Sequence, residues 1–170
     1  MKPIKIIAVM IPLLLVSCNS GGESTLTGAG SPEHEFWVTL EEAQERAYDE
    51  GQHMLLDIYT EWCGFCRRMN AETYADEGVQ ELLDRYFIAT RINAESSQSV
   101  TFLGRSYTME ELALQFGVAS YPTTVFLTPN GEPLAAQAGF FEAPHFRQML
   151  GYVGTGSYQE VTFEEYSNTQ

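Results

Sequence analysis

Residues 55–66 have the sequence Leu55-Leu56-Asp57-Ile58-Tyr59-Thr60-Glu61-Trp62-Cys63-Gly64-Phe65-Cys66. The first half belongs to an apolar run, 54–59, that is interrupted only by Asp57 and is typical of a buried central strand. Two cysteines separated by two residues follow, at the start of the segment 63–70, which we expect to be helical. Because a helix start carries partial positive charge, it favours the thiolate of the first cysteine. The stretch therefore predicts a strand that leads into a redox-active pair, with Cys63 exposed and Cys66 shielded.

Two other uses of such a cysteine pair are disfavoured by the surrounding sequence. Haem attachment requires a histidine directly after the second cysteine, where this chain has Arg67. A structural zinc site needs about four ligands, but there is no second cysteine pair and the three histidines are scattered, so we expect no metal. A structural disulfide is the remaining alternative, although so small a loop gains little chain entropy.

The rest of the sequence predicts an α/β domain with a mixed sheet covered by helices on both faces. Capping boxes at Thr39, Thr108 and Thr162 predict helix starts. Pro129-Asn130-Gly131 predicts a turn between two antiparallel strands. The expected helices are residues 40–50, 63–70, 77–86, 108–116 and 144–153, and the expected strands are residues 54–59, 87–92, 123–127 and 134–138. Residues 99–106 are expected to form an inserted hairpin with its turn at Gly104.

These motifs resemble those of the thioredoxin superfamily. The match consists of residues 55–66 and of Tyr121-Pro122-Thr123, which is similar to the cis-proline loop of that family. The resemblance extends over about residues 36–153. The longer segment after the cysteines and the insert before Thr108 make the chain more similar to periplasmic thioredoxin-like reductases than to small cytoplasmic thioredoxin.

The resemblance implies a thioredoxin fold and a set of site residues. Cys63 would be the attacking nucleophile and Cys66 the resolving thiol, with their disulfide serving in place of a cofactor. Asp57 would accept and return the proton of Cys66, because burial raises the pKa of a carboxyl group; a purely structural carboxylate is the alternative. In the substrate-binding region, the cis residue Pro122 would present the backbone of Tyr121 to an extended client, and Trp62 would shield one side of the disulfide.

The N-terminus predicts export and a lipid anchor. Two lysines precede an apolar segment of about eleven residues, which is too short to span a bilayer and is typical of a signal peptide. The following Leu15-Val16-Ser17-Cys18 resembles the lipobox of bacterial lipoproteins. We therefore expect a signal peptide at residues 1–17, a lipidated Cys18 with a flexible tether at 18–35, the domain at 36–154, and an acidic tail with a short helix at 155–170. Asn19, in place of Asp, favours the outer membrane.

The net charge of the chain bears on which partners it can bind. The formal net charge of the 170-residue chain is −14, and so acidic a surface disfavours binding to nucleic acid. The sequence thus predicts a lipid-anchored periplasmic oxidoreductase that reduces disulfides of client proteins and is recharged by a membrane electron donor. The alternative is a lipid-anchored binding module whose cysteine pair is a structural disulfide.

Overall fold

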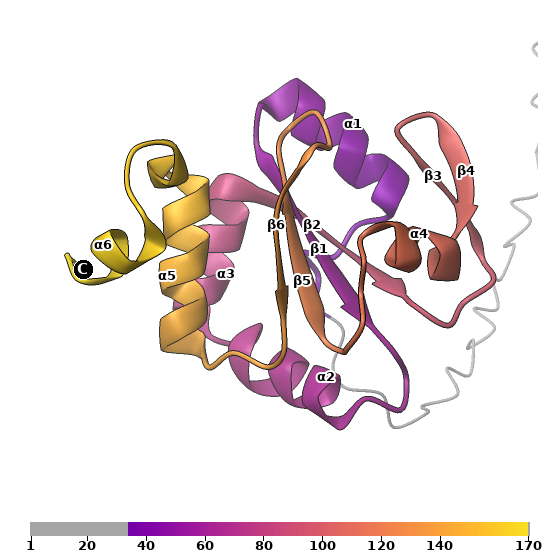
Figure 1. Ribbon diagram of the computed structural model, residues 1–170, viewed down its shortest axis with the longest axis horizontal. Coiled ribbons are helices and arrows are strands. Elements are labelled where there is room, and N and C mark those ends of the chain that lie inside the picture. Colours follow the sequence, from indigo (N-terminus) through magenta and orange to yellow (C-terminus); the bar gives the residue numbers. More distant parts are fainter. Residues whose placement is uncertain (1–33, 170) are drawn as a thin grey trace, which may run out of the picture.

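The computed structural model describes residues 34–169. They form a mixed four-stranded sheet with helices on both faces, the predicted fold class (Figure 1). The predicted signal peptide, the lipidated Cys18 and nearly all of the tether lie outside the described residues. None of the helices in the described part is long and apolar enough to cross a bilayer.

The strands of the main sheet lie in the order β2-β1-β5-β6. They are β1 (His53–Tyr59), β2 (Phe87–Asn93), β5 (Thr123–Leu127) and β6 (Pro133–Ala138). Strand β1 pairs parallel to β2 and antiparallel to β5, and β5 pairs antiparallel to β6. A parallel crossover unit followed by an antiparallel hairpin is the predicted order. This order places β1, which carries Asp57, next to β5, which begins at the end of the cis-proline loop, in the middle of the sheet.

Alternation along β1 divides the core between the two faces of the sheet. Leu56 packs on one face, against α1 (Leu40–Glu50), α4 (Met109–Gln115) and the inserted hairpin. Leu55 packs on the other face, against α3 (Glu77–Tyr86) and α5 (Ala143–Gly154). In Figure 1, α3 and α5 accordingly lie on one side of the sheet, and α4 and the hairpin lie on the other. Asp57, two residues after Leu55, shares the face covered by α3 and α5.

Local hydrogen bonds explain where the helices begin. The Thr108 side chain accepts from the backbone N–H of Glu111, and the Glu111 carboxylate accepts from the backbone N–H of Thr108, so the predicted capping box is complete. At α1 the Thr39 hydroxyl accepts from the Glu42 backbone, but the return bond from the Glu42 side chain is missing. The prediction of a full box at Thr39 was therefore only half correct.

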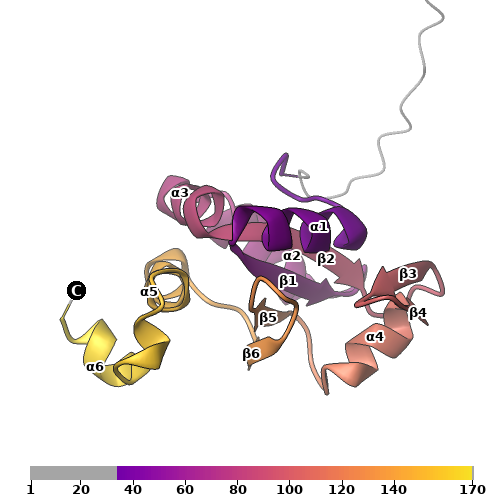
Figure 2. The same ribbon diagram turned by 90° about the horizontal axis from the view of Figure 1, so that it is seen from above.

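Two elements flank the central sheet at opposite ends of the molecule (Figure 2). One is the predicted insert, a hairpin of β3 (Ser99–Phe102) and β4 (Arg105–Thr108). Its turn includes Gly104 and also Leu103, whose φ of 48° places it among the few non-glycine residues that adopt left-handed backbone. The other is the short helix α6 (Phe163–Ser167), which begins at the predicted Thr162 cap and packs against α5 through Tyr152.

Candidate active site

The cysteine pair lies where β1 passes into α2 (Gly64–Arg68). The Cys63 backbone N–H donates to the carbonyl of Thr60, which makes the turn that ends the strand. Cys63 is the residue that caps α2, and its Sγ accepts a hydrogen bond of 3.0 Å from the Cys66 backbone N–H. A disulfide joins the two residues across a Cα–Cα distance of 5.2 Å. The helix start thus directs a backbone donor at the sulfur of Cys63, and such a donor stabilises a thiolate.

The helix that carries the pair does not continue as the sequence suggested. After Arg68 the backbone forms a π-helical turn, Met69–Thr73, and Tyr74 follows it. The wider turn lets the side chain of Tyr74 reach the sheet face beneath the motif, where it is 1% exposed.

The expectation of an exposed Cys63 was wrong for the disulfide form. Cys63 is 4% exposed and Cys66 is 5% exposed, so both residues are buried to nearly the same extent. The physical reason is that Cys63 Sγ turns inward to cap the helix. Its neighbours Trp62 and Phe65 instead project outward, with 64% and 60% of their surfaces exposed. The pair therefore lies just beneath a surface formed by aromatic side chains.

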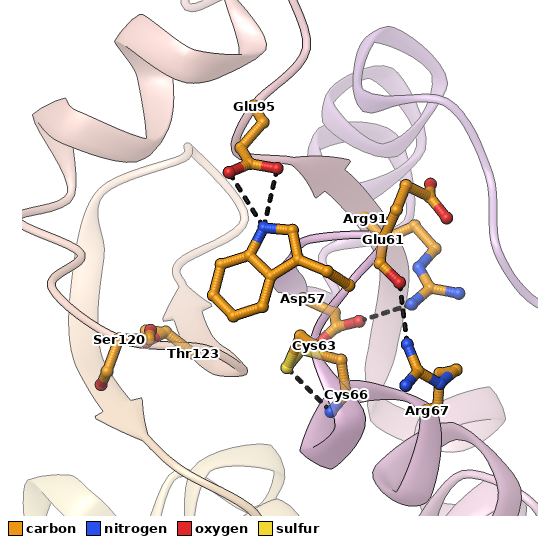
Figure 3. Close-up of a disulfide and its surroundings, with 10 residues drawn as sticks. Asp57, Glu61, Cys63, Cys66, Arg67, Arg91, Glu95, Ser120 and Thr123 are labelled. Carbon is orange, nitrogen blue, oxygen red and sulfur yellow. Dashed lines mark hydrogen bonds and ion pairs between the residues drawn. A yellow bond between two sulfur atoms is a disulfide. The ribbon is translucent and has the colours of Figure 1, made fainter.

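Trp62 is held in place by two contacts from distant parts of the chain. Its indole Nε1 donates to both carboxylate oxygens of Glu95, at 3.0 and 2.9 Å (Figure 3). Its ring meets the ring of Tyr121 edge to face, with 6.1 Å between centroids. Two of the predicted substrate-binding residues thus contact each other. Glu95 was not predicted, because nothing in the sequence indicates that a residue 33 positions away would face Trp62.

The cis-proline loop lies at the same end of the sheet as the cysteine pair. Thr123, the first residue of β5, pairs with Ile58 near the end of β1. The Tyr121–Pro122 bond is cis, as the resemblance implied. The carbonyl of Pro122 accepts from the backbone of Gly139, and the Thr123 hydroxyl donates to the carbonyl of Ser120 at 2.7 Å. These bonds fix the loop beside Trp62.

A second aromatic contact borders the motif on the side of α2. The ring of Phe65 lies 6.4 Å from the ring of Phe140, and the guanidinium of Arg68 lies 4.3 Å above the Phe140 ring. Phe140 follows β6, far from the motif in sequence, and was not predicted. The surface around the disulfide is therefore aromatic on both sides.

Asp57 forms a buried ion pair beneath the motif. Its side chain is 3% exposed, and its Oδ2 accepts from Arg91 Nη2 at 3.0 Å (Figure 3). The register explains this contact, because Asp57 and Arg91 are direct neighbours across β1 and β2. Burial raises the pKa of Asp57 above its ordinary value, and Arg91 opposes that shift by stabilising the carboxylate. A carboxyl on which burial and a charged partner act in opposite directions is a candidate for proton transfer.

Arg91 is itself held by aromatic rings. Its guanidinium lies 4.2 Å from the ring centre of Tyr59 and 5.0 Å from that of Trp37. Trp37 belongs to the segment before α1, which the sequence marked only as a short apolar run. No group of three or more histidine, cysteine or acidic side chains within residues 34–169 could hold a metal ion.

Comparison with known proteins agrees with this geometry. Residues 40–154 match the family described as thioredoxin-like domain. The chain belongs to this family. This is a family of thiol-disulfide oxidoreductases, and a disulfide joins Cys63 and Cys66 of this chain.

Individual relatives of this thioredoxin-like protein include both sequences and structures. The thiol:disulfide interchange protein DsbD of Actinobacillus pleuropneumoniae is 29% identical over 115 residues, which cover 66% of this chain and 18% of that protein. The chain thus spans less than a fifth of such relatives. A putative disulphide-isomerase from Bacteroides thetaiotaomicron has 27% identity and a TM-score of 0.56, covering 78% of this chain and 97% of that one. A thioredoxin from Thermus thermophilus has the same identity and TM-score over 69% and 85%.

Proposed function

We propose that this protein reduces disulfides in client proteins by dithiol exchange through Cys63 and Cys66. The observation that carries the proposal is the placement of this pair at the start of α2, with Cys63 Sγ on a backbone donor and the cis-proline loop alongside. The relationship to proteins named for thiol:disulfide interchange and disulphide isomerisation supports it.

The exchange takes place in two balanced steps. The thiolate of Cys63 attacks one sulfur of a client disulfide, which forms a mixed disulfide and releases the other client sulfur as a thiolate. Asp57 takes the proton of Cys66, and the Cys66 thiolate attacks Cys63 Sγ. This second step closes the Cys63–Cys66 disulfide and expels the second client sulfur as a thiolate. Asp57 gives its proton back to this sulfur and solvent protonates the first one, so the client leaves as a dithiol. Two electrons pass to the client, so a dithiol donor must reduce the protein before the next cycle.

Side chains around the pair are placed for client binding. An extended client segment would pair with the backbone of Tyr121 beside Pro122, while the exposed rings of Trp62 and Phe65 offer apolar contact on either side of the disulfide. Because Cys63 is only 4% exposed, the client must displace one of these rings or the pair must open on reduction.

We further propose that the protein works in the cell envelope, anchored by lipid on Cys18, at the outer membrane, and recharged by a membrane electron donor. The basic and apolar N-terminus followed by Leu15-Val16-Ser17-Cys18 supports export and lipidation. Replacing Cys18 by Ser should move the protein from the membrane fraction to the soluble fraction and abolish incorporation of labelled fatty acid. Retention in the membrane fraction without label would contradict the anchor.

One observation favours a second candidate, in which the disulfide is only a structural clasp in a binding module. That observation is the near-equal burial of Cys63 and Cys66. Reduction of insulin by dithiothreitol, followed as turbidity, separates the two functions. Wild-type protein and Cys18→Ser should accelerate it, and Cys63→Ser should not. Equal rates for wild type and Cys63→Ser would refute the oxidoreductase.

Trapping in cells would then identify the clients. A Cys66→Ala variant cannot complete the second step, so clients should accumulate as mixed disulfides on Cys63 that dithiothreitol releases. The direction of electron flow is tested by equilibrating the pair with redox buffers. A potential well above that of ordinary periplasmic disulfides would overturn the assignment as a reductase.

A further inference from the structure

Three buried polar atoms gather on the sheet face that carries the Asp57–Arg91 pair. They are Asp57 Oδ1, the hydroxyl of Tyr74 and the hydroxyl of Thr124. Their residues are 2%, 1% and 0% exposed, so all three atoms are buried away from bulk solvent. Buried polar atoms nearly always have partners, and a group of them at one place needs an explanation.

The strand register explains why Asp57 and Thr124 lie together. Asp57 on β1 is the direct neighbour of Arg91 on β2 and of Thr124 on β5. Side chains of direct cross-strand neighbours point to the same face. The three side chains therefore form a row across the sheet, with the carboxyl in the middle, the guanidinium on one side and a hydroxyl on the other.

Tyr74 approaches this row from the helical layer. The π-helical turn before it carries its ring inward, where it packs edge to face against Trp37 at 4.9 Å and Phe146 at 5.5 Å. The Asp57 carboxyl and the Thr124 hydroxyl both act on the pKa of Tyr74, so the three groups lie near one another, although no hydrogen bond joins them. Burial raises the pKa of Tyr74 well above its ordinary value, so this phenol keeps its proton and can only act as a donor to a carboxylate.

We propose that Tyr74 is a positioning residue for the exchange reaction: its hydroxyl, itself aligned by Thr124, donates to Asp57 Oδ1 and holds the carboxyl ready to take the proton of Cys66. Arg91 occupies the other oxygen, Oδ2, so Tyr74 and Arg91 divide the carboxyl between them. This inference rests on the proposed function, because it assigns Asp57 its proton-transfer role.

The sign of the effect follows from the contact. A donor to a carboxylate stabilises its charged form, so the Tyr74 hydroxyl lowers the pKa of Asp57 against the larger effect of burial. Two other groups act on Asp57. Arg91 favours the carboxylate, and Tyr59 interacts electrostatically with both Asp57 and Arg91. Removing the Tyr74 hydroxyl should leave these contacts in place and increase the proton affinity of Asp57.

The test compares Tyr74→Phe and Thr124→Val, each of which removes a hydroxyl and keeps the shape of the side chain. Tyr158→Phe is the matched control, because its hydroxyl contacts His53 at the opposite end of β1. Titration of the Asp57 carboxyl by carbon NMR should show the midpoint raised by about half a pH unit in Tyr74→Phe, roughly a threefold gain in proton affinity. We expect a smaller rise in Thr124→Val and none in Tyr158→Phe.

The pH profile of Cys63 alkylation by iodoacetamide in the reduced protein provides the second measurement. Tyr74→Phe should shift this profile in the wild-type background and leave it unchanged in an Asp57→Asn background. The proposal would be overturned if the titration midpoint of Asp57 did not change in either Tyr74→Phe or Thr124→Val. It would also be overturned if Tyr74→Phe shifted the alkylation profile equally in the Asp57→Asn background. If circular dichroism shows Tyr74→Phe to be unfolded, Thr124→Val decides alone. A wild-type protein inactive on insulin would refute the proposed function, while the NMR midpoint would still report on Tyr74.

Discussion

Replacing Arg91 by Met is expected to destabilise the protein by an amount that depends on pH. The Arg91–Asp57 contact measures 3.0 Å, with side chains 19% and 3% exposed. Two unit charges at that distance attract each other by roughly 5 kcal/mol at an effective dielectric constant of about 20. Loss of one partner from a buried pair costs about 3–5 kcal/mol. Since Arg91 is partly screened by solvent, we expect about 3 kcal/mol at pH 8. Met retains an unbranched chain that can still pack against Trp37 and Tyr59.

The pH dependence follows from the sign of the Asp57 shift. Its pKa in the folded protein is already raised by burial, and loss of Arg91 raises it further. Below the pKa of the unfolded chain, about 4, the carboxyl is neutral in both states and the loss of Arg91 costs little. At higher pH the unfolded chain gives up this proton while the folded protein retains it, so folding becomes less favourable. The destabilisation should therefore be smaller at about pH 5 than at about pH 8.

Urea unfolding of the disulfide form, followed by circular dichroism, measures this effect. Arg85→Met, which removes an exposed arginine from α3, is the control and should change stability by at most about 0.5 kcal/mol. The double variant Asp57→Asn/Arg91→Met should recover about 2 kcal/mol at pH 8, because a neutral amide needs no charged partner. Equal destabilisation at both pH values, or no recovery in the double variant, would refute this reasoning.

Four further variants test other parts of the structure. Thr108→Ala should cost about 1 kcal/mol in urea unfolding because it breaks a complete capping box, and Thr39→Ala should cost less because only one of its two bonds is present. Glu95→Ala removes the hydrogen-bond acceptor of the Trp62 indole, so dithiothreitol should reduce the disulfide several-fold faster. The free energy of unfolding should change by at most about 0.5 kcal/mol. An unchanged rate would show that Trp62 does not limit access of the reductant to the disulfide. Trp37→Ala removes a half-buried ring from Arg91 and Tyr74 and should cost about 2–3 kcal/mol in the same unfolding assay.

The sequence predicted the framework because its signals are local. An apolar run interrupted by one acid predicted β1, and threonines three residues before glutamates predicted the starts of α1, α4 and α6. The cysteine pair and the cis-proline loop could be assigned from short motifs for the same reason. The contact between Arg91 and Asp57 is explained by the register of β1 and β2, which makes the two residues direct neighbours.

Features that depend on contacts between distant segments were not predictable. The Glu95–Trp62 hydrogen bond joins residues 33 positions apart. The approach of Tyr74 to Asp57 depends on a π-helical turn, and no residue in 69–73 predicts such a turn. Left-handed backbone at Leu103 is disfavoured by its own side chain, so only the closure of the β3–β4 hairpin explains it. The sequence predicted that Cys63 lies at the start of a helix, but it did not predict the direction of Sγ. The side chain points inward because it caps that helix.

Asp57 makes the fold less stable at neutral pH than an apolar or amide residue would, and this cost is itself an argument for its role. Burial raises its pKa, so the folded protein must either keep a proton on the carboxyl or hold a charge in a dry site. The chain surrounds it with an arginine held between two rings, a tyrosine and a threonine, drawn from the two neighbouring strands and from the helical layer. A carboxyl needed only for stability would not require so many supports, because an apolar residue would pack there without them. The arrangement is explained if the carboxyl must change its protonation state beneath the cysteine pair, since burial favours its neutral form and Arg91 favours its charged form.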